Sequence, residues 1–159
     1  MKTLFVLRHG KAEAHSGGGD FARKLTDRGE ADAAKTGKYI AGITSTPPWI
    51  VTSDAGRALS TARIVAGVVG VGKVDVDHDI YEASVDDLCH VVQRIPDTEH
   101  AAVIVGHNPG LEGLVYFLVD DPTTVVGLGT ANVAQVELAV DRWDDVASGC
   151  GRAVSTYSP

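Results

Sequence analysis

The chain has 159 residues, of which 44% are hydrophobic and 22% charged, and its 14 basic and 21 acidic residues give a formal net charge of −7. This length and composition fit one globular domain over residues 1–159 and exclude a disordered chain. An acidic surface disfavours contact with a phosphate backbone, so we expect no nucleic-acid partner. No apolar stretch reaches the ~20 residues of a membrane helix, so we expect no membrane association.

Three short apolar runs predict strands that are buried on both faces, as in a parallel sheet: Thr3–Leu7, Trp49–Thr52 and Ala102–Val105. Lys73–Ile80 alternates between apolar and charged residues, which predicts a half-exposed strand near an edge. Gln135–Val140 also alternates, and we expect it to pair with Arg152–Tyr157 across a turn at Gly149–Gly151. The last two strands would then form a C-terminal edge hairpin.

Amphipathic segments with the spacing of helices alternate with these strands. The expected N-caps are, in chain order, Asp27 in a capping box with Glu30, Asp54, Ser84 and Asn108, the last followed by Pro109 as the first helical residue. The first helix would run to about Ala41, and the Ser16–Gly19 segment before it is expected to be a mobile loop. The alternation predicts an α/β protein, a three-layer α/β/α sandwich with a mostly parallel central sheet.

Basic side chains recur at one kind of position in this predicted fold. Arg8 and His9 follow the first strand, Arg57 lies in the first turn of a helix, and His107 follows the strand Ala102–Val105. The carboxyl ends of parallel strands share one edge of a sheet, so we expect these side chains to converge there. Guanidinium groups bind phosphate through paired hydrogen bonds, and a neutral imidazole can attack phosphorus. The sequence therefore predicts a phosphoryl-binding site that needs no metal.

Each of these residues taken singly has a simpler interpretation. His9 alone could cap a turn, Arg57 could be a solvated helix residue, and His107 could belong to a plain strand-to-helix turn. A cation in the first turn of a helix opposes the helix dipole, however, which favours a functional reason for Arg57. The other histidines show no metal-ligand spacing, and we expect neither a metal nor another cofactor: His15, His78, His90 and His100.

Four segments in this order resemble the histidine phosphatase superfamily: Leu7–Ala12, Leu25–Gly29, Ser53–Ala62 and Val105–Gly110. The resemblance implies a phosphatase that works through a phosphohistidine enzyme intermediate. It implies that His9 is the nucleophile and that Arg8, Arg57 and His107 form the phosphate pocket. We expect Asn108 to bind substrate there as well. Lys11 and Arg23 are expected to be solvated or to guide the substrate.

The short chain and the sequence Arg23–Thr26 resemble the SixA-type phosphohistidine phosphatases within this superfamily. The resemblance also makes Glu82 the candidate general acid, although an exposed carboxylate without a catalytic role is an equal alternative. Phosphohistidine on a signalling or phosphotransfer protein is then the expected substrate. A small phosphate ester is the second possibility, and a non-catalytic phosphate-binding module is the third. The two cysteines, Cys89 and Cys150, form no CxxC pair, which fits a cytoplasmic protein.

Overall fold

A six-stranded sheet with the order β3-β2-β4-β1-β5-β6 runs through the molecule, whose computed structural model describes all 159 residues. Its strands are β1 (Lys2–Arg8), β2 (Trp49–Thr52), β3 (Asp75–Val76), β4 (Ala101–Gly106), β5 (Val133–Leu138) and β6 (Gly151–Tyr157). The first four strands are mutually parallel, β5 is antiparallel to β1, and β6 is antiparallel to β5. The predicted mostly parallel sheet is therefore confirmed.

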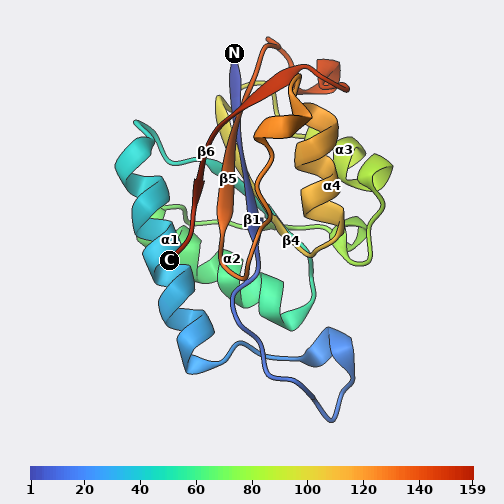
Figure 1. Cartoon of the computed structure of the whole chain (residues 1–159). Coiled ribbons are helices and arrows are strands. Elements are labelled where there is room, and N and C mark those ends of the chain that lie inside the picture. Colours follow the sequence, from blue (N-terminus) through green and yellow to red (C-terminus); the bar gives the residue numbers. More distant parts are fainter.

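Two helices cover each face of this sheet (Figure 1). Helices α1 (Asp27–Ile43) and α2 (Gly56–Val69) lie on one face, and α3 (Val85–Gln93) and α4 (Gly110–Leu118) lie on the other. Along β1, Leu4 and Val6 join the core beneath α3 and α4, whereas Phe5 and Leu7 join the core beneath α1 and α2. Successive side chains of a strand point to opposite faces, so a strand covered on both sides is apolar throughout. The three-layer α/β/α prediction is confirmed.

The predicted N-cap of α3 is confirmed, and the other three are each displaced by one residue. Ser84 caps α3 in a capping box with Asp87. Helix α1 is capped instead by Thr26, whose Oγ1 accepts a hydrogen bond from the Gly29 amide at 3.0 Å, and it ends at Ile43. Asp27 lies in the first turn of α1, where its charge still suits the helix dipole. At α2 the N-cap is Ala55, which has no capping side chain.

The start of α4 also differs from the prediction. Pro109 occupies the N-cap position, and the helix begins at Gly110. Asn108 lies one residue earlier, but its Oδ1 still accepts a hydrogen bond from the Glu112 amide at 3.3 Å. The Asn108 side chain therefore stabilises the first turn of α4 from outside the helix.

The strand predicted over Lys73–Ile80 is wrong for most of its length. Only Asp75 and Val76 pair with the sheet, at its edge, and the chain then enters the 3-10 helix η2 (His78–Ile80). The Asp77 side chain accepts a hydrogen bond from the Asp79 amide at 2.9 Å, which turns the backbone away from the ladder. This turn carries the following residues toward the carboxyl edge of the sheet.

The C-terminal strands do form an antiparallel edge pair, as predicted. Their connection is not a tight turn at Gly149–Gly151. It spans residues 139–150 and includes the 3-10 helix η4 (Trp143–Asp145). The indole of Trp143 is fully buried and donates a hydrogen bond to the Glu99 carbonyl at 2.8 Å, so the segment packs as part of the core. No helix of the structure combines the length and apolar character required to cross a membrane.

Candidate active site

The carboxyl edge of the parallel strands, at the bottom of Figure 1, brings the predicted basic residues together. Arg8 is the last residue of β1 and pairs in register with Gly106, the last residue of β4. The His9 amide donates a hydrogen bond to the Gly106 carbonyl at 3.1 Å. His9 and His107 thus leave two neighbouring strands at the same level, and their ring centroids lie 5.2 Å apart. Arg57 reaches them from the first turn of α2.

The backbone around His9 is fixed from two sides. The Gly10 amide donates to Thr61 Oγ1 at 3.0 Å, and this hydroxyl in turn donates to the Arg57 carbonyl at 2.7 Å. On the other side, a Cβ atom at Gly10 would lie 2.7 Å from the Gly29 carbonyl oxygen in the first turn of α1. Only glycine permits this close approach without displacing α1. The loop after β1 is therefore clamped between α1 and α2.

The hydrogen bonds of His9 define its protonation state. Its Nδ1 lies 2.8 Å from the Gly10 carbonyl oxygen, and its Nε2 lies 3.3 Å from Arg57 Nε, which can only donate. Nδ1 therefore carries the proton and Nε2 the lone pair. Burial, followed by the positive charges of Arg57 and Arg8, lowers the pKa of His9 to about 4. At neutral pH the ring is uncharged and presents Nε2 as a nucleophile.

His107 is also held neutral. Burial, and then the charges of His9 and Arg57, lower its pKa to about 3. Its Nε2 lies 2.9 Å from Ser53 Oγ, which accepts a further hydrogen bond from the Ala55 amide at 3.2 Å. Ser53 thereby orients the ring from the carboxyl end of β2.

Two buried nitrogen atoms of this cluster have no hydrogen-bond partner: Arg8 Nε and His107 Nδ1. Elsewhere the Arg8 guanidinium is anchored, because its NH1 donates to the Leu128 carbonyl at 3.1 Å. Buried polar groups are almost always paired in native proteins, so Arg8 Nε indicates an acceptor that the chain itself does not supply, and His107 Nδ1 can donate to the same acceptor when it carries the ring proton. An oxyanion such as a phosphoryl group fits this requirement.

Asp20 is a member of the site that the sequence analysis missed. Located in the 3-10 helix η1 (Asp20–Ala22), it accepts hydrogen bonds from Tyr81 Oη at 2.7 Å, Arg23 NH1 at 2.9 Å and Arg57 NH2 at 3.1 Å. These donors, Tyr81 and Arg23 first, hold the pKa of the Asp20 carboxyl well below its usual range. The same contact raises the pKa of Tyr81 to about 12. Asp20 is thus a carboxylate that shares the Arg57 guanidinium with any bound anion.

A cavity of about 430 Å³ opens beside the two neutral histidines and Arg57. Arg57 and His107 line it, whereas the half-buried Arg8 and the buried His9 do not. Its other lining residues are Asp20, Ile80, Tyr81, Glu82, Ala83, Leu88, Asn108, Pro109 and Gly110. This space exceeds the size of a phosphoryl group, so it also has room for the group to which the phosphorus is attached.

The remaining predicted residues differ in their distance from this cavity. Glu82 lines it, is exposed, and has a φ of 53°, a left-handed conformation that non-glycine residues rarely adopt. Asn108 also lines it, but its amide donates to Glu112 and to the Leu128 carbonyl. Arg23 lies at the rim, where it contacts Asp20.

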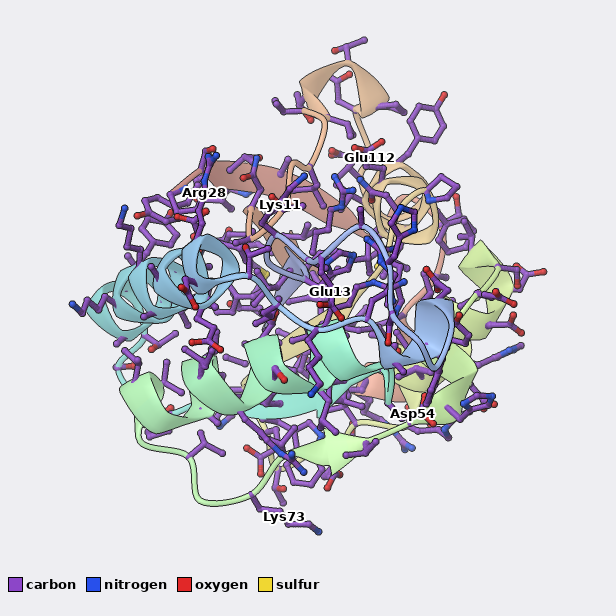
Figure 2. All side chains as sticks on the ribbon, turned by 90° about the horizontal axis from the view of Figure 1, so that it is seen from below. Lys11, Glu13, Arg28, Asp54, Lys73 and Glu112 are labelled. Carbon is purple, nitrogen blue, oxygen red and sulfur yellow. The ribbon has the colours of Figure 1, made fainter.

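Lys11 is exposed and, like Arg23, does not line the cavity. Figure 2 looks onto this edge of the sheet from below and shows Lys11 and Glu13 on the same segment, between Glu112 on one side and Asp54 on the other. The backbone carbonyl of Lys11 accepts hydrogen bonds from Thr26, so the residue anchors the cap of α1. A substrate-guiding contribution of its side chain stays a prediction.

Comparison with known proteins matches this chain to one family model and to several solved structures. The family model described as histidine phosphatase superfamily (branch 1) matches residues 4–103. Two solved SixA structures, one from Nakamurella multipartitia and one of the protein histidine phosphatase complexed with tungstate, each superpose with a TM-score of 0.84. They share 22% and 21% identity over 99% of this chain and 96% and 97% of their own. The mycobacterial glucosyl-3-phosphoglycerate phosphatase Rv2419c, complexed with VO3, superposes with a TM-score of 0.74 at 17% identity over the whole of both chains.

Proposed function

This chain belongs to the histidine phosphatase superfamily, a family of phosphatase-type enzymes, and we propose that it removes the phosphoryl group from phosphohistidine on a signalling or phosphotransfer protein. One observation carries the catalytic part of this proposal. A neutral His9 presents the lone pair of Nε2 beside the Arg57 guanidinium, in a cluster that holds two unpaired buried nitrogens. Such a site binds an oxyanion and sets a nucleophile against it.

Substrate binding places the phosphoryl oxygens on the cationic end of the cavity. Arg8 Nε and His107 Nδ1 each gain an acceptor, and Arg57 turns part of its donor set toward the phosphoryl group. For His107 this requires the proton on Nδ1, so that Ser53 Oγ donates to Nε2. The guanidinium groups balance the negative charge, which remains nearly constant through the reaction.

In the first chemical step His9 Nε2 attacks phosphorus in line with the bond to the leaving group. The bond between phosphorus and the substrate nitrogen breaks as the bond to His9 Nε2 forms, and the departing imidazole keeps the electron pair and takes up a proton. The Gly10 carbonyl, 2.8 Å from Nδ1, stabilises the positive charge that develops on the His9 ring. In the second step water attacks the same phosphorus, inorganic phosphate leaves, and His9 regains its lone pair.

Phosphohistidine is supported as the substrate by the access to the site and by the chemistry of its bond. The cavity opens at the sheet edge, and on the side away from α3 and α4 its lining comes from the one-turn helix η1 and the start of α2, so we infer that a side chain of another protein can enter. A P–N bond to imidazole also breaks more readily than a P–O ester bond, so it depends less on a general acid. The similarity to SixA over almost the whole chain agrees with this substrate.

A small phosphate ester is the second candidate substrate, and the size of the cavity favours it. About 430 Å³ is sufficient for a compact metabolite, and the related Rv2419c is a phosphatase of glucosyl-3-phosphoglycerate. The two candidates use the same nucleophile and phosphate contacts and differ in the leaving group.

The proposal is tested by trapping the enzyme intermediate. Rapid quenching of the protein with a histidine-phosphorylated phosphotransfer domain in EDTA should give a phosphoenzyme, which mass spectrometry at neutral pH maps to His9. Parallel assays with sugar phosphates and nucleotides rank the substrates. A phosphoenzyme at any other residue would refute the mechanism, and a strong preference for a sugar phosphate would refute the protein substrate. Absence of any turnover, with retained phosphate binding, would make the chain a binding module.

A further inference from the structure

We propose that Tyr81 and Phe21 form an aromatic wall at the leaving-group end of the cavity, which makes the enzyme selective for phosphoryl groups attached to a flat aromatic ring. The inference rests on the proposed function and deepens it, because the imidazole of phosphohistidine is such a ring. It assigns substrate selection to two residues that have no part in the phosphate contacts.

Tyr81 and Phe21 extend a series of neighbouring rings that begins with His9 and His107. Tyr81 lines the cavity, and its ring stands edge-on to His107, with centroids 5.5 Å apart and an interplanar angle of 76°. Phe21 stands edge-on to Tyr81 on the outer side, at 5.1 Å and 81°. The phosphate cluster is therefore joined to the surface by aromatic rings in edge-to-face contact.

Tyr81 lies on the side from which an in-line leaving group departs. The Arg57 guanidinium contacts His9 Nε2 through its Nε and the Asp20 carboxylate through its NH2, and Tyr81 Oη binds the same carboxylate oxygen at 2.7 Å. Tyr81 is thus separated from the nucleophile by the group that binds the phosphoryl oxygens. A leaving group opposite His9 passes this ring.

The surface that surrounds Tyr81 suits a ring better than a sugar. Ile80, Ala83, Leu88 and Pro109 contribute apolar surface to the same cavity. A sugar could use the polar lining residues, such as Glu82 and Asn108, only for those hydroxyl groups that reach them, whereas an aromatic ring loses little when it leaves water against the apolar side chains. Phe21 does not line the cavity, but it packs against the Tyr81 ring that does and is 40% exposed, so we infer that it can contact the protein that carries the leaving group.

Two model substrates with the same reacting bond test the wall. N-phosphorylimidazole and phosphoramidate both have a P–N bond, but only the first has a ring. We expect Tyr81→Leu and Phe21→Leu each to lower the ratio of kcat/KM for the ring substrate to that for phosphoramidate about fivefold, the contribution of one aromatic contact. Tyr81→Phe keeps the ring and should keep this ratio. Tyr116→Leu, which removes an exposed aromatic side chain outside the cavity, is the matched control.

This ratio of kcat/KM values distinguishes a role of Tyr81 and Phe21 in substrate selection from a purely structural role. If the two leucine variants lower both kcat/KM values equally, or change neither, the wall is refuted. Phe21 is exposed, so its variant should fold even if Tyr81→Leu does not. If the wild type hydrolyses phosphate esters but neither P–N compound, the proposed phosphohistidine substrate is refuted. The aromatic wall is then tested with phenyl phosphate and propyl phosphate, and the same variants should lower the ratio of their kcat/KM values by the same factor.

Discussion

The candidate active site has two halves that are built in different ways. The inner half consists of Arg8, His9, Arg57 and His107, which extend from β1, β4 and the first turn of α2 and have their backbones bonded to neighbouring core elements. The outer half consists of Asp20, Phe21, Tyr81 and Glu82, which lie on one-turn helices or in the loop that follows. The comparison indicates that the sheet fixes the chemistry, while the outer segments can vary the choice of substrate without disturbing it.

The largest effect is expected in the inner half. His9→Ala removes the only nucleophile we assign, and we expect kcat with an aryl phosphate in EDTA to fall about 10⁴-fold or more. The protein should still fold, because the substitution removes one buried ring at the edge of the core and leaves both hydrophobic clusters intact. Turnover and a thermal unfolding curve measured on the same preparation check both expectations. Near-normal turnover by the variant would exclude His9 as the nucleophile.

The buried histidines of the inner half should also make stability depend on pH. The folded pKa values are about 4 for His9 and about 3 for His107, below the ordinary value of 6.5. Between pH 6.5 and 4 the unfolded chain binds more protons than the folded one, so the free energy of unfolding must fall as the pH is lowered. At about 1.4 kcal/mol per pKa unit, His9 alone accounts for roughly 3 kcal/mol of this loss.

Urea unfolding at pH 7 and pH 4.5 measures this loss, and His9→Gln should flatten it. A variant that loses stability in parallel with the wild type would show that other groups govern the acid sensitivity. No comparable term is expected from the outer half, since Asp20 and Tyr81 are engaged with each other across the whole of this pH window.

The inner half could be anticipated from the sequence because regular elements determine its geometry. Continuous apolar runs marked β1, β2 and β4, parallel strands end at a common edge, and Arg8, His9, Arg57 and His107 stand at those ends. Their convergence is observed, and their catalytic roles remain predictions. One nearby prediction was wrong: Thr26 rather than Asp27 caps α1, because the Thr26 hydroxyl accepts a hydrogen bond from the Gly29 amide and the helix begins one residue earlier.

The outer half could not be predicted from the sequence, because irregular backbone determines the positions of its residues. Asp20 follows a run of glycines without periodicity, and its contact with Tyr81 spans 61 residues of sequence. Tyr81 reaches the site only because the chain leaves the sheet after Val76, where alternation predicted a longer strand. One available signal was the spacing of Asp20 and Arg23, which suits a carboxylate–guanidinium pair within one helical turn.

Substitution of Glu82, in the outer half, should lower activity toward a phosphate ester more than activity toward a P–N substrate. If its carboxyl group protonates the leaving group, Glu82→Gln lowers kcat/KM for an alkyl phosphate about 10²-fold, because an alkoxide is a poor leaving group. N-phosphorylimidazole, whose leaving group needs little help, should lose less than about threefold. Both substrates are assayed on one preparation. Equal losses would assign Glu82 a structural role at its strained backbone position, where φ is 53°.

The smallest effect is expected at Asp20, the outer residue that pairs with the Arg57 guanidinium of the inner half. Its carboxylate lies 3.1 Å from Arg57 NH2 and would face a bound phosphate dianion across that guanidinium. Asp20→Asn removes the repulsion but keeps a hydrogen-bond acceptor, so inorganic phosphate should inhibit about fivefold more strongly at low salt, with the gain shrinking as salt screens the charge. Asp144→Asn removes an equal charge from η4, which lies outside the site and pairs with Arg142, and serves as the control. Weaker inhibition in Asp20→Asn would mean that the carboxylate chiefly holds Arg57 in its binding orientation. Phosphate binding by the inner half would then depend on this residue of the outer half.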